Sequence, residues 1–567
     1  MANFSNMPSV SIQRTKMKRP FMHNLSFNLG EICVLHWDEV IPGSTHKIDY
    51  GALLRMSTPI APIMQDIQYD LFSFFCPYRL CWTNWKRFMG ENDTGAGAIN
   101  SINSDKVVPS VQTQGSVINS IADDFGIPAY KSGNSAFSVS LLPFRALFLI
   151  YNRWFRNQNV EAPITASLGD SSNGTDLFYA GLTDNTGTIP SGYGSRLVAY
   201  KLPDYFTSAL PYAQKGNPVS IFPTNSYVPV YAMGGTGAPI MPSHTFYATT
   251  FEKAGTGGIA EATYGTGAHA LTAGSGGAPG IYKMRSDSGT YTPSGTLGEV
   301  SPNNLFGDLS NAVNTTIDNL RFAFQMQKFL WRDSTYGSRY WEILYAHYSV
   351  TSPDATLQDP QLLGHRKFLI NVQQVLQTTG FTDPTNTNLG TPGANSTTAQ
   401  RGDIFTGSFC EHGVIITVGV ARQKTHVYSQ GLNRAWSRQN RTDFYFPVFA
   451  NLGAQKVLKK EIDVQASDPD GVFGYQEAWA EYRYMPSYNS GYLNPVRANS
   501  LDYWTLAENF GSTPTLSTSF LKEDRSNLTR CLVTGASGPD FIASFYFADT
   551  CVNPMPLYSI PGFADHH

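Results

Sequence analysis

Residues 321–364 read RFAFQMQKFLWRDSTYGSRYWEILYAHYSVTSPDATLQDPQLLG. The stretch begins inside a helical pattern, because Ile317, Leu320, Phe324 and Trp331 recur at three-, four- and seven-residue steps. It breaks at Gly337 into an aromatic-rich segment and closes in a polar arm that contains proline. No catalytic motif occurs in it. We expect a helix over about 317–333, followed by a segment that packs on several sides against its own chain or against neighbouring chains.

The composition of the whole chain favours a protein with much of its surface in contacts. Only 15% of the 567 residues are charged, against a typical ~25%, whereas the chain has 35 Phe, 30 Tyr and 9 Trp. Charged residues are depleted and aromatic residues are enriched at the centres of protein interfaces. The alternative is a monomeric β-protein with an unusually apolar surface. The net charge of −3 argues against a protein whose main task is to coat nucleic acid, but it allows a local basic patch.

The cysteines and histidines show no metal-binding spacing. The six cysteines form no CxxC pair, so we expect free thiols, no metal site and no cofactor; they are Cys33, Cys76, Cys81, Cys410, Cys531 and Cys551. No apolar signal core and no run of about 18 apolar residues occurs, so we expect no membrane insertion.

Residues 1–28 are polar and basic, and we interpret them as an extended N-terminal arm. Arg14, Lys16, Lys18 and Arg19 are the candidate nucleic-acid-binding residues, because clustered cations neutralise phosphates. Phe21 and Phe27 are aromatic residues that could stack on unpaired bases. An arm bound to a neighbouring subunit is an equally good interpretation.

The remainder, 29–567, is predicted to be one mainly β domain with long inserted loops and a few helices. Helical patterns cover 117–125 and 143–156, and strand-like runs cover 30–37, 69–75, 367–376, 414–420, 443–449 and 541–547. The elements do not alternate in a βαβ pattern, so an antiparallel sandwich is favoured over a doubly wound sheet. Residues 228–302 are dominated by Gly, Thr, Ala and Ser and are predicted to form a surface insertion.

Enzyme signatures are absent, and we expect no enzymatic activity. The sequence contains no GxxxxGK[ST], GxSxG or HExxH motif. A carbohydrate-binding or carbohydrate-active β-protein is the alternative, and it would need two converging carboxylates. Glu477 and Glu481 are four residues apart, but their segment has strand-like spacing, which predicts a structural Glu481–Arg483 pair instead.

Short blocks along the whole chain resemble the major capsid protein of the microviruses, small tailless phages with circular single-stranded DNA, and most closely its gokushovirus branch. The blocks are FAFQ at 322–325, GSRY at 337–340, SPD at 352–354, MPSV at 7–10, DEVIPG at 38–43, RMSTP at 55–59, FMGEN at 88–92, YSQGL at 428–432 and PMPLY at 554–558. The stretch 331–336 and the insertion 228–302 depart from the family pattern.

The resemblance implies an eight-stranded antiparallel jelly roll of the viral capsid type, with 228–302 as a protrusion at the threefold axes. It also implies a structural protein of the virion: 60 copies that assemble in the host cytoplasm into a T=1 icosahedral shell around single-stranded DNA. The partners it implies are an internal scaffolding protein, minor DNA-associated virion proteins and a host surface receptor, which could be a glycan.

Overall fold

The computed structural model describes residues 13–89, 106–165, 167–171, 179–184, 188, 196–216, 230–233, 239–240, 305–307, 317–335, 342, 345–347, 349, 358–376 and 392–558. These residues fall into two compact units, one formed by 1–215 with 331–567 and the other by 216–330. The first unit carries the two large sheets and is described first.

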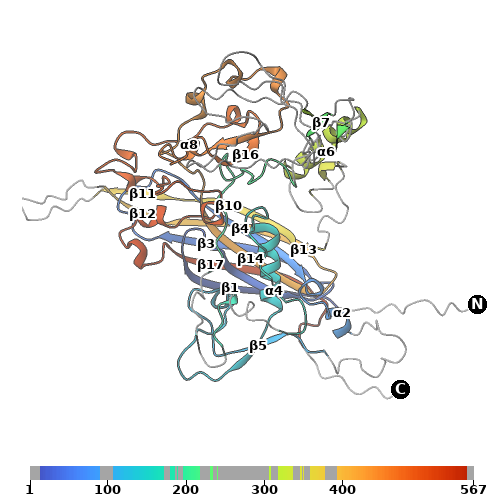
Figure 1. Ribbon diagram of the computed structural model, residues 1–567. Coiled ribbons are helices and arrows are strands. Elements are labelled where there is room, and N and C mark those ends of the chain that lie inside the picture. Colours follow the sequence, from blue (N-terminus) through green and yellow to red (C-terminus); the bar gives the residue numbers. More distant parts are fainter. Residues whose placement is uncertain are drawn as a thin grey trace, which may run out of the picture. The chain divides into compact units, whose positions relative to one another are not determined.

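Eight long strands of the first unit form two four-stranded antiparallel sheets (Figure 1). One sheet has the order β1-β17-β3-β13 and the other has the order β10-β4-β14-β2. The strand bounds are β1 Thr15–Phe27, β2 Cys33–Val40, β3 Thr45–Met56, β4 Ile67–Pro77, β10 Gln361–Ile370, β13 Thr398–Ser408, β14 Gly413–Gln423 and β17 Phe541–Asn553.

The pairing of these eight strands is nested along the chain. The first strand pairs with the last (β1 with β17), the second with the second last (β2 with β14), the third with β13, and the fourth with β10. Two further pairings, β17 with β3 and β14 with β4, join these pairs into sheets. Most of these contacts are remote in sequence, so the sheets form only when both ends of the chain are present.

Period-two alternation places one face of the first sheet in the core between the sheets. In β3, Ile48, Tyr50, Ala52 and Leu54 are buried, and in β17 the buried residues are Phe541, Ala543, Phe545 and Phe547. They pack with Leu71, Ile415 and other residues of the second sheet in one cluster. Because side chains on a strand point alternately to either side, the intervening residues of β3 and β17 face away from this core.

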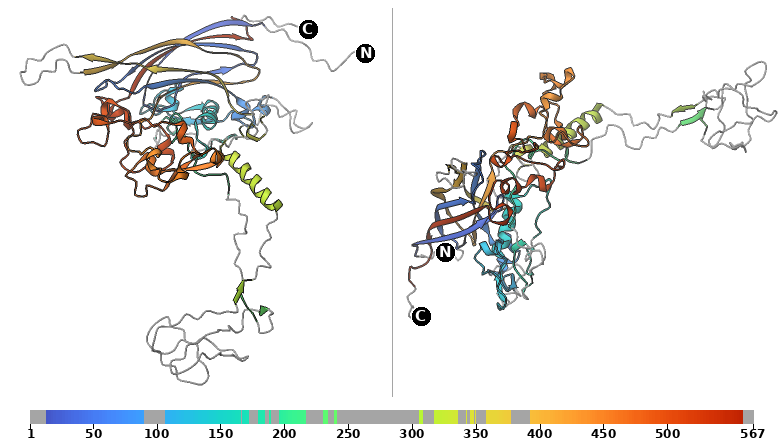
Figure 2. Two further views of the ribbon diagram at one scale, coloured as in Figure 1. Left: turned by 90° about the horizontal axis from the view of Figure 1, so that it is seen from above. Right: turned by 90° about the vertical axis from the view of Figure 1, so that its left-hand side faces the viewer.

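The two central strands of the second sheet, β4 and β14, are covered on both faces, whereas the edge strand β10 is largely exposed. In β14, GVIITVGVARQ, every residue except Arg422 is buried, which is the continuous apolar pattern of a strand without a solvent face. Its outer side chains pack against α1 (Tyr78–Cys81), α3 (Ile121–Asp124) and α4 (Leu142–Ile150), and α4 continues as a π-turn over Tyr151–Phe155. Figure 2 (left) shows β1 and β17 on the opposite side of the sandwich, where no helix covers them.

A third cluster lies in the long connection between β14 and β17, packed against Tyr205 and Phe206. This connection holds β15 (Ala454–Leu458), α8 (Lys459–Ile462), β16 (Val472–Glu477), α9 (Thr518–Leu521) and α10 (Ser526–Thr529). It also holds 3-10 turns at Arg434–Ser437, Arg441–Asp443, Pro447–Phe449, Ala480–Arg483, Gly491–Leu493, Asp502–Trp504 and Gly535–Ser537. The remaining short elements of the unit are α2 Trp85–Phe88, β5 Ser110–Thr113, β6 Phe137–Ser140, β11 Val372–Leu376 and β12 Pro392–Ser396.

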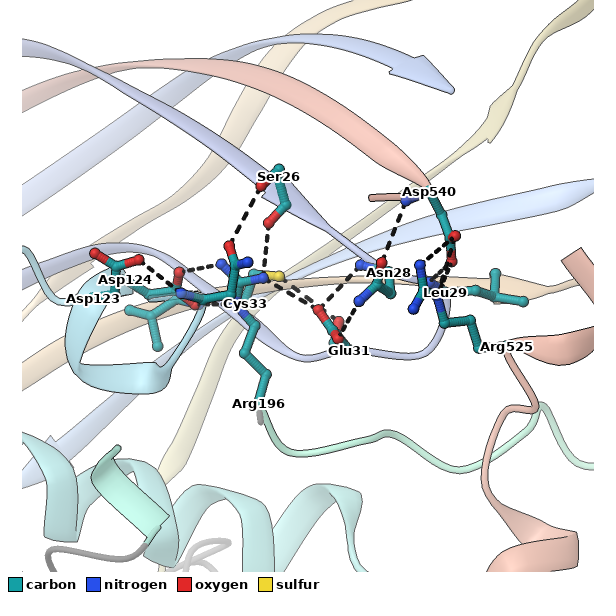
Figure 3. Close-up of polar contacts among 12 residues, drawn as sticks. Ser26, Asn28, Leu29, Glu31, Cys33, Asp123, Asp124, Arg196, Arg525 and Asp540 are labelled. Atoms are coloured by element: carbon teal, nitrogen blue, oxygen red, sulfur yellow. Dashed lines mark hydrogen bonds and ion pairs between the residues drawn. The ribbon is translucent and has the colours of Figure 1, made fainter. Parts of the chain in front are cut away.

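A buried ionic network fastens the turn between β1 and β2 (Figure 3). Arg196 donates two hydrogen bonds to Asp124, of 2.7 and 2.9 Å, and contacts Glu31 at 3.2 Å. Asp540 accepts hydrogen bonds from the backbone N–H of Leu29 at 2.9 Å and from Arg525. Moving this turn would separate buried charges from their partners, which costs free energy. The network therefore holds the turn in one position.

Gly30 lies at the centre of the same turn because no other residue fits there. Its φ of +81° is a left-handed conformation that glycine adopts without strain, and a Cβ at this position would lie 2.5 Å from Cβ of Glu523. The backbone N–H of Gly30 donates to the carbonyl of Ala421 at 2.8 Å, so the turn is held directly against β14.

A second group of buried ionisable residues lies near the same end of β14. Lys201 donates to Glu508 at 2.6 Å, and the His426 ring lies 3.3 Å from Glu508 and 3.7 Å from Glu523. Complete burial raises the pKa of Glu523 to about 7, and the charges of His426 and Lys201 offset only part of this effect.

The structure corrects several sequence predictions. Residues 15–27 are not an arm: they pair with β17 along their whole length, because Leu25 and Phe27 complete the core. Residues 443–449 are not a strand but lie at two 3-10 turns, where Pro447 begins the second one. The 117–125 helix is a single turn, α3, capped by Ser120. The strands predicted at 30–37, 69–75, 414–420 and 541–547 are confirmed with shifted bounds, and so is the helix starting near 143. The single strand predicted at 367–376 is instead the end of β10 and the whole of β11, which pair with different strands on either side of Asn371.

The second unit contributes β7 (Val230–Met233), β8 (Pro239–Ile240) and β9 (Leu305–Gly307), which form a small antiparallel sheet. The predicted helix is confirmed as α6, Ile317–Thr335, and Phe322, Phe324 and Phe329 on it are exposed. Most of the 228–302 insertion lies outside the described residues, as do most of 336–357. Among the described residues, no helix combines the length and apolarity needed to cross a membrane.

Candidate nucleic-acid interface

The outer face of the sheet β1-β17-β3-β13 is the one large sheet surface in the described residues that other elements leave open. Its side chains are the outward members of each alternating strand, exposed or half-buried. We call this surface the basic face and define it by Lys16, Lys18, Met22, Lys47, Asp49, Leu53, Arg55, Arg401, Asp403, Ile542 and Tyr546.

The basic face contains five Lys or Arg residues and two Asp residues, so positive charge is in excess. Lys47 lies 3.8 Å from Asp49, and Asp403 is paired with Arg366 at 2.9 Å. Lys16, Lys18, Arg55 and Arg401 are exposed and form no ion pair with any other described residue. Four unpaired cations on one open sheet face form a surface that attracts a polyanion.

Apolar side chains lie between these cations. Tyr546 and Met22 are paired across β1 and β17, and the register continues through Gly51 to Arg401. Glycine at 51 leaves the space beside Tyr546 without a side chain. An exposed tyrosine next to cations can stack on an unpaired base, which adds roughly 1–3 kcal/mol where it occurs.

The structure separates the four residues predicted to bind nucleic acid. Arg14 is exposed just before β1, and Lys16 and Lys18 lie on the basic face. Arg19 points to the opposite side of β1, where its guanidinium contacts Asp38 and Asp549. Arg19 therefore serves the fold, because both of its carboxylate partners would have to be released before it could bind a phosphate.

The two aromatic residues predicted to stack on bases are also engaged within the protein. Phe21 stacks between His36, at 5.2 Å, and Phe547, at 5.4 Å. Phe27 is buried and stacks on Phe541. Burial makes Phe27 unavailable to a base. Phe21 is 36% exposed beside its two ring contacts, so its stacking on a base stays a prediction.

The Arg19 contacts belong to a compact polar cluster that the sequence did not suggest. Asp38, His46 and Asp549 bring together ligand atoms within 4.8 Å of one another, the residue types of a divalent-cation site. Arg19 Nη2 contacts both carboxylates, so the guanidinium already provides the positive charge. Burial acts to raise the pKa of Asp549, but His46 and Arg19 outweigh it and hold this pKa below its usual value.

The candidate carboxylate pair does not form a catalytic site. Glu477 is bound by Arg483, whereas Glu481 faces Arg434 and Arg438 at 3.7 and 3.5 Å. The predicted Glu481–Arg483 pair is therefore wrong. Strand β16 ends at Glu477, and Trp479 adopts φ +69°, which turns the chain and separates the two glutamates.

Lys47, Arg55, Arg401 and Tyr546 were missed by the sequence analysis. They come from strands that are hundreds of residues apart in the chain, and each alone is an ordinary surface residue of an alternating strand. The one available signal was the period-two pattern of β3 and β17, which places them on the side opposite the core.

Two antiparallel sheets with long insertions and few helices are consistent with a β-fold of the viral capsid class. The chain matches the family model described as "Capsid protein (F protein)" over residues 5–563. It is similar to capsid protein VP1 of Bdellovibrio phage phiMH2K (35% identity), of Spiroplasma virus 4 (34%) and of Chlamydia phage 1 (32%). Each alignment covers 99% of this chain and 97% of the relative.

The chain therefore belongs to the F-type phage capsid protein family, and its relatives above are gokushovirus proteins. It is a structural major capsid protein, and as such it is part of the virion.

Proposed function

We propose that sixty copies of this protein form a closed T=1 icosahedral shell around circular single-stranded DNA, with the basic face turned towards the genome. The observation that carries the proposal is the difference between the two sheets. The central strands of one sheet are buried on both faces, whereas the other sheet presents four unpaired cations on an open surface. A genome inside a shell is the polyanion that such a surface suits.

We further propose that the sandwich is an eight-stranded jelly roll. The nested pairing of the eight strands, first with last and fourth with fifth, supports this topology. A jelly roll can be described as one long antiparallel hairpin that is folded over on itself. Each strand of the first half therefore pairs with the strand that has the same rank when counted back from the last strand.

The remaining proposals rest on the family alone. Assembly takes place in the host cytoplasm, with an internal scaffolding protein and minor DNA-associated virion proteins as partners. The 228–302 insertion forms the threefold protrusion and contacts a host receptor, which could be a glycan. The shell function requires no bond to be made or broken, so no enzymatic activity is needed.

Particle formation and DNA content test the proposal together. The full-length protein is expressed in cells that carry the viral genome, and particles are purified by velocity sedimentation. We expect closed particles of sixty subunits that contain nuclease-protected single-stranded DNA. A protein that sediments only as a monomer would refute the shell, and particles that protect no DNA would refute the proposed enclosure of single-stranded DNA.

Replacing 235–299 by a short linker tests the insertion separately. We expect particles to form in normal yield and host attachment to fall. Failure of particle formation would show instead that the insertion is needed to build the shell.

A further inference from the structure

Exposed apolar side chains are concentrated in one segment of the connection between β14 and β17. Of 35 exposed large apolar residues in the described parts of the chain, 13 lie within the 66 residues 436–501. We define the aromatic surface by five of them: Phe444, Tyr445, Val448, Leu452 and Tyr482. A concentration of exposed apolar side chains of this kind indicates a site of protein contact.

The aromatic surface is held in a fixed arrangement. Tyr445 packs edge-on against Trp479 at 5.6 Å and against Tyr482 at 6.1 Å. The Arg438 guanidinium lies 4.3 Å from the Tyr482 ring and 5.7 Å from the Phe444 ring. Rings that are already ordered lose little conformational entropy when a partner binds, which favours a contact role.

Trp479 supports these rings from an unusual backbone conformation. Its φ of +69° is uncommon for a bulky residue. Two hydrogen bonds stabilise it: its backbone N–H donates to Gln455 Oε1 at 2.9 Å, and its indole N–H donates to the carbonyl of Phe449 at 2.8 Å. Strain kept in place by surrounding contacts is typical of a functional surface.

The charges around the aromatic surface are balanced within the segment itself. Residues 430–504 contain eight Lys or Arg and eight Asp or Glu, a net charge of zero. Most of them pair with each other: Arg434–Glu461, Arg438–Glu481, Lys459–Asp468, Lys460–Asp470 and Arg483–Glu477. Two identical faces that carry no excess of one charge can meet without repulsion, which a basic or acidic face cannot do.

We propose that the aromatic surface binds the aromatic surface of a second copy of this chain across a two-fold axis of the shell, with Val448, its most exposed side chain, beside its own copy at the axis. The inference rests on the proposed shell function and names one of its contacts. An isologous contact needs a self-complementary patch, and an aromatic, charge-balanced surface is self-complementary. The five side chains expose roughly 550 Å² per copy, below the ~800 Å² per partner of a standard interface. A contact of this size is weak alone and suits one of several contacts that cooperate in a closed shell.

Charge substitution at Val448 tests the proposal. Val448 is 89% exposed, so Val448→Asp and Val448→Lys should leave the subunit folded, which its melting temperature checks. The matched control is Val533→Asp, because Val533 is 66% exposed but lies outside the aromatic surface. Full-length wild-type protein, each variant alone, and the two Val448 variants co-expressed are compared by particle yield on a sucrose gradient.

We expect Val448→Asp and Val448→Lys each to lower the particle yield roughly tenfold or more, because like charges would face each other across the axis. Co-expression of the two variants should restore the yield, since Asp then faces Lys, and Val533→Asp should match the wild type. Wild-type yield from either single variant would overturn the proposal. Failure of the co-expressed pair would also overturn it, because the surface would then meet a different face, a scaffolding protein or a receptor. Absence of wild-type particles would count against the proposed shell instead.

Discussion

Replacing Lys16 and Lys18 together by alanine tests whether the basic face binds the genome. Both side chains point outward from β1 and form no ion pair with any other described residue, so little stability depends on them. Lys424→Ala with Lys459→Ala is the matched control. It removes the same two charges, but from residues paired with Asp66 and Asp468 elsewhere on the surface.

The expected size of the effect follows from the number of unpaired cations. Each phosphate contact on a single strand contributes about 0.7 to the slope of log K against log salt, so four cations predict a slope of about −2.8. Between about 50 and about 200 mM salt, wild-type affinity should then fall about 50-fold. The two-lysine variant keeps two cations, so its slope should be about −1.4 and its affinity should fall about sevenfold.

The assay is fluorescence anisotropy of a labelled single-stranded oligonucleotide with unassembled full-length subunits over this salt range. The nuclease-protected DNA in particles from the same variants is measured in parallel. We expect the control pair to keep the wild-type slope. A two-lysine variant with the wild-type slope, or a control pair that lowers the slope equally, would refute the assignment of DNA to this face.

Three further predictions concern the fold that positions this face. Arg196→Met should lower the free energy of unfolding by about 3–5 kcal/mol, because it leaves buried carboxylates unpaired. The control Arg366→Met removes an exposed ion pair and should lower it by less than about 1 kcal/mol. Chemical denaturation measures both values. Glu523 has a pKa raised to about 7 in the fold, so the folded state holds an extra proton between pH 4.5 and 7. Its contribution to stability therefore falls by up to about 3 kcal/mol as the pH rises through that window, and Glu523→Gln should abolish this fall. Deleting residues 1–27 should abolish soluble protein, since β17 then loses its neighbour, and soluble wild-type-like protein from this deletion would contradict the assignment of β1.

Much of the secondary structure followed from local patterns. The period-two alternation around Phe541–Phe547 corresponds to a strand with one buried face. The continuous apolar run around Val414–Val420 corresponds to a strand that is buried on both faces. The predictions failed where a residue's partner was remote. Arg19 and Phe27 looked like parts of a basic arm because their partners, Asp549 and Phe541, lie more than 500 residues away.

The sequence by itself determined the family, the β class and the low charge and aromatic excess of a protein made for contacts, because these are properties of composition and local order. Only the tertiary structure decided which cations are available. Nested pairing joins β1 to β17 and β3 to β13, and the pleat then directs Lys16 and Lys18 to the open side but Arg19 to two carboxylates. Adjacent residues of a strand face opposite sides of its sheet, so a cluster of charges in sequence becomes a surface only after the sheet has formed.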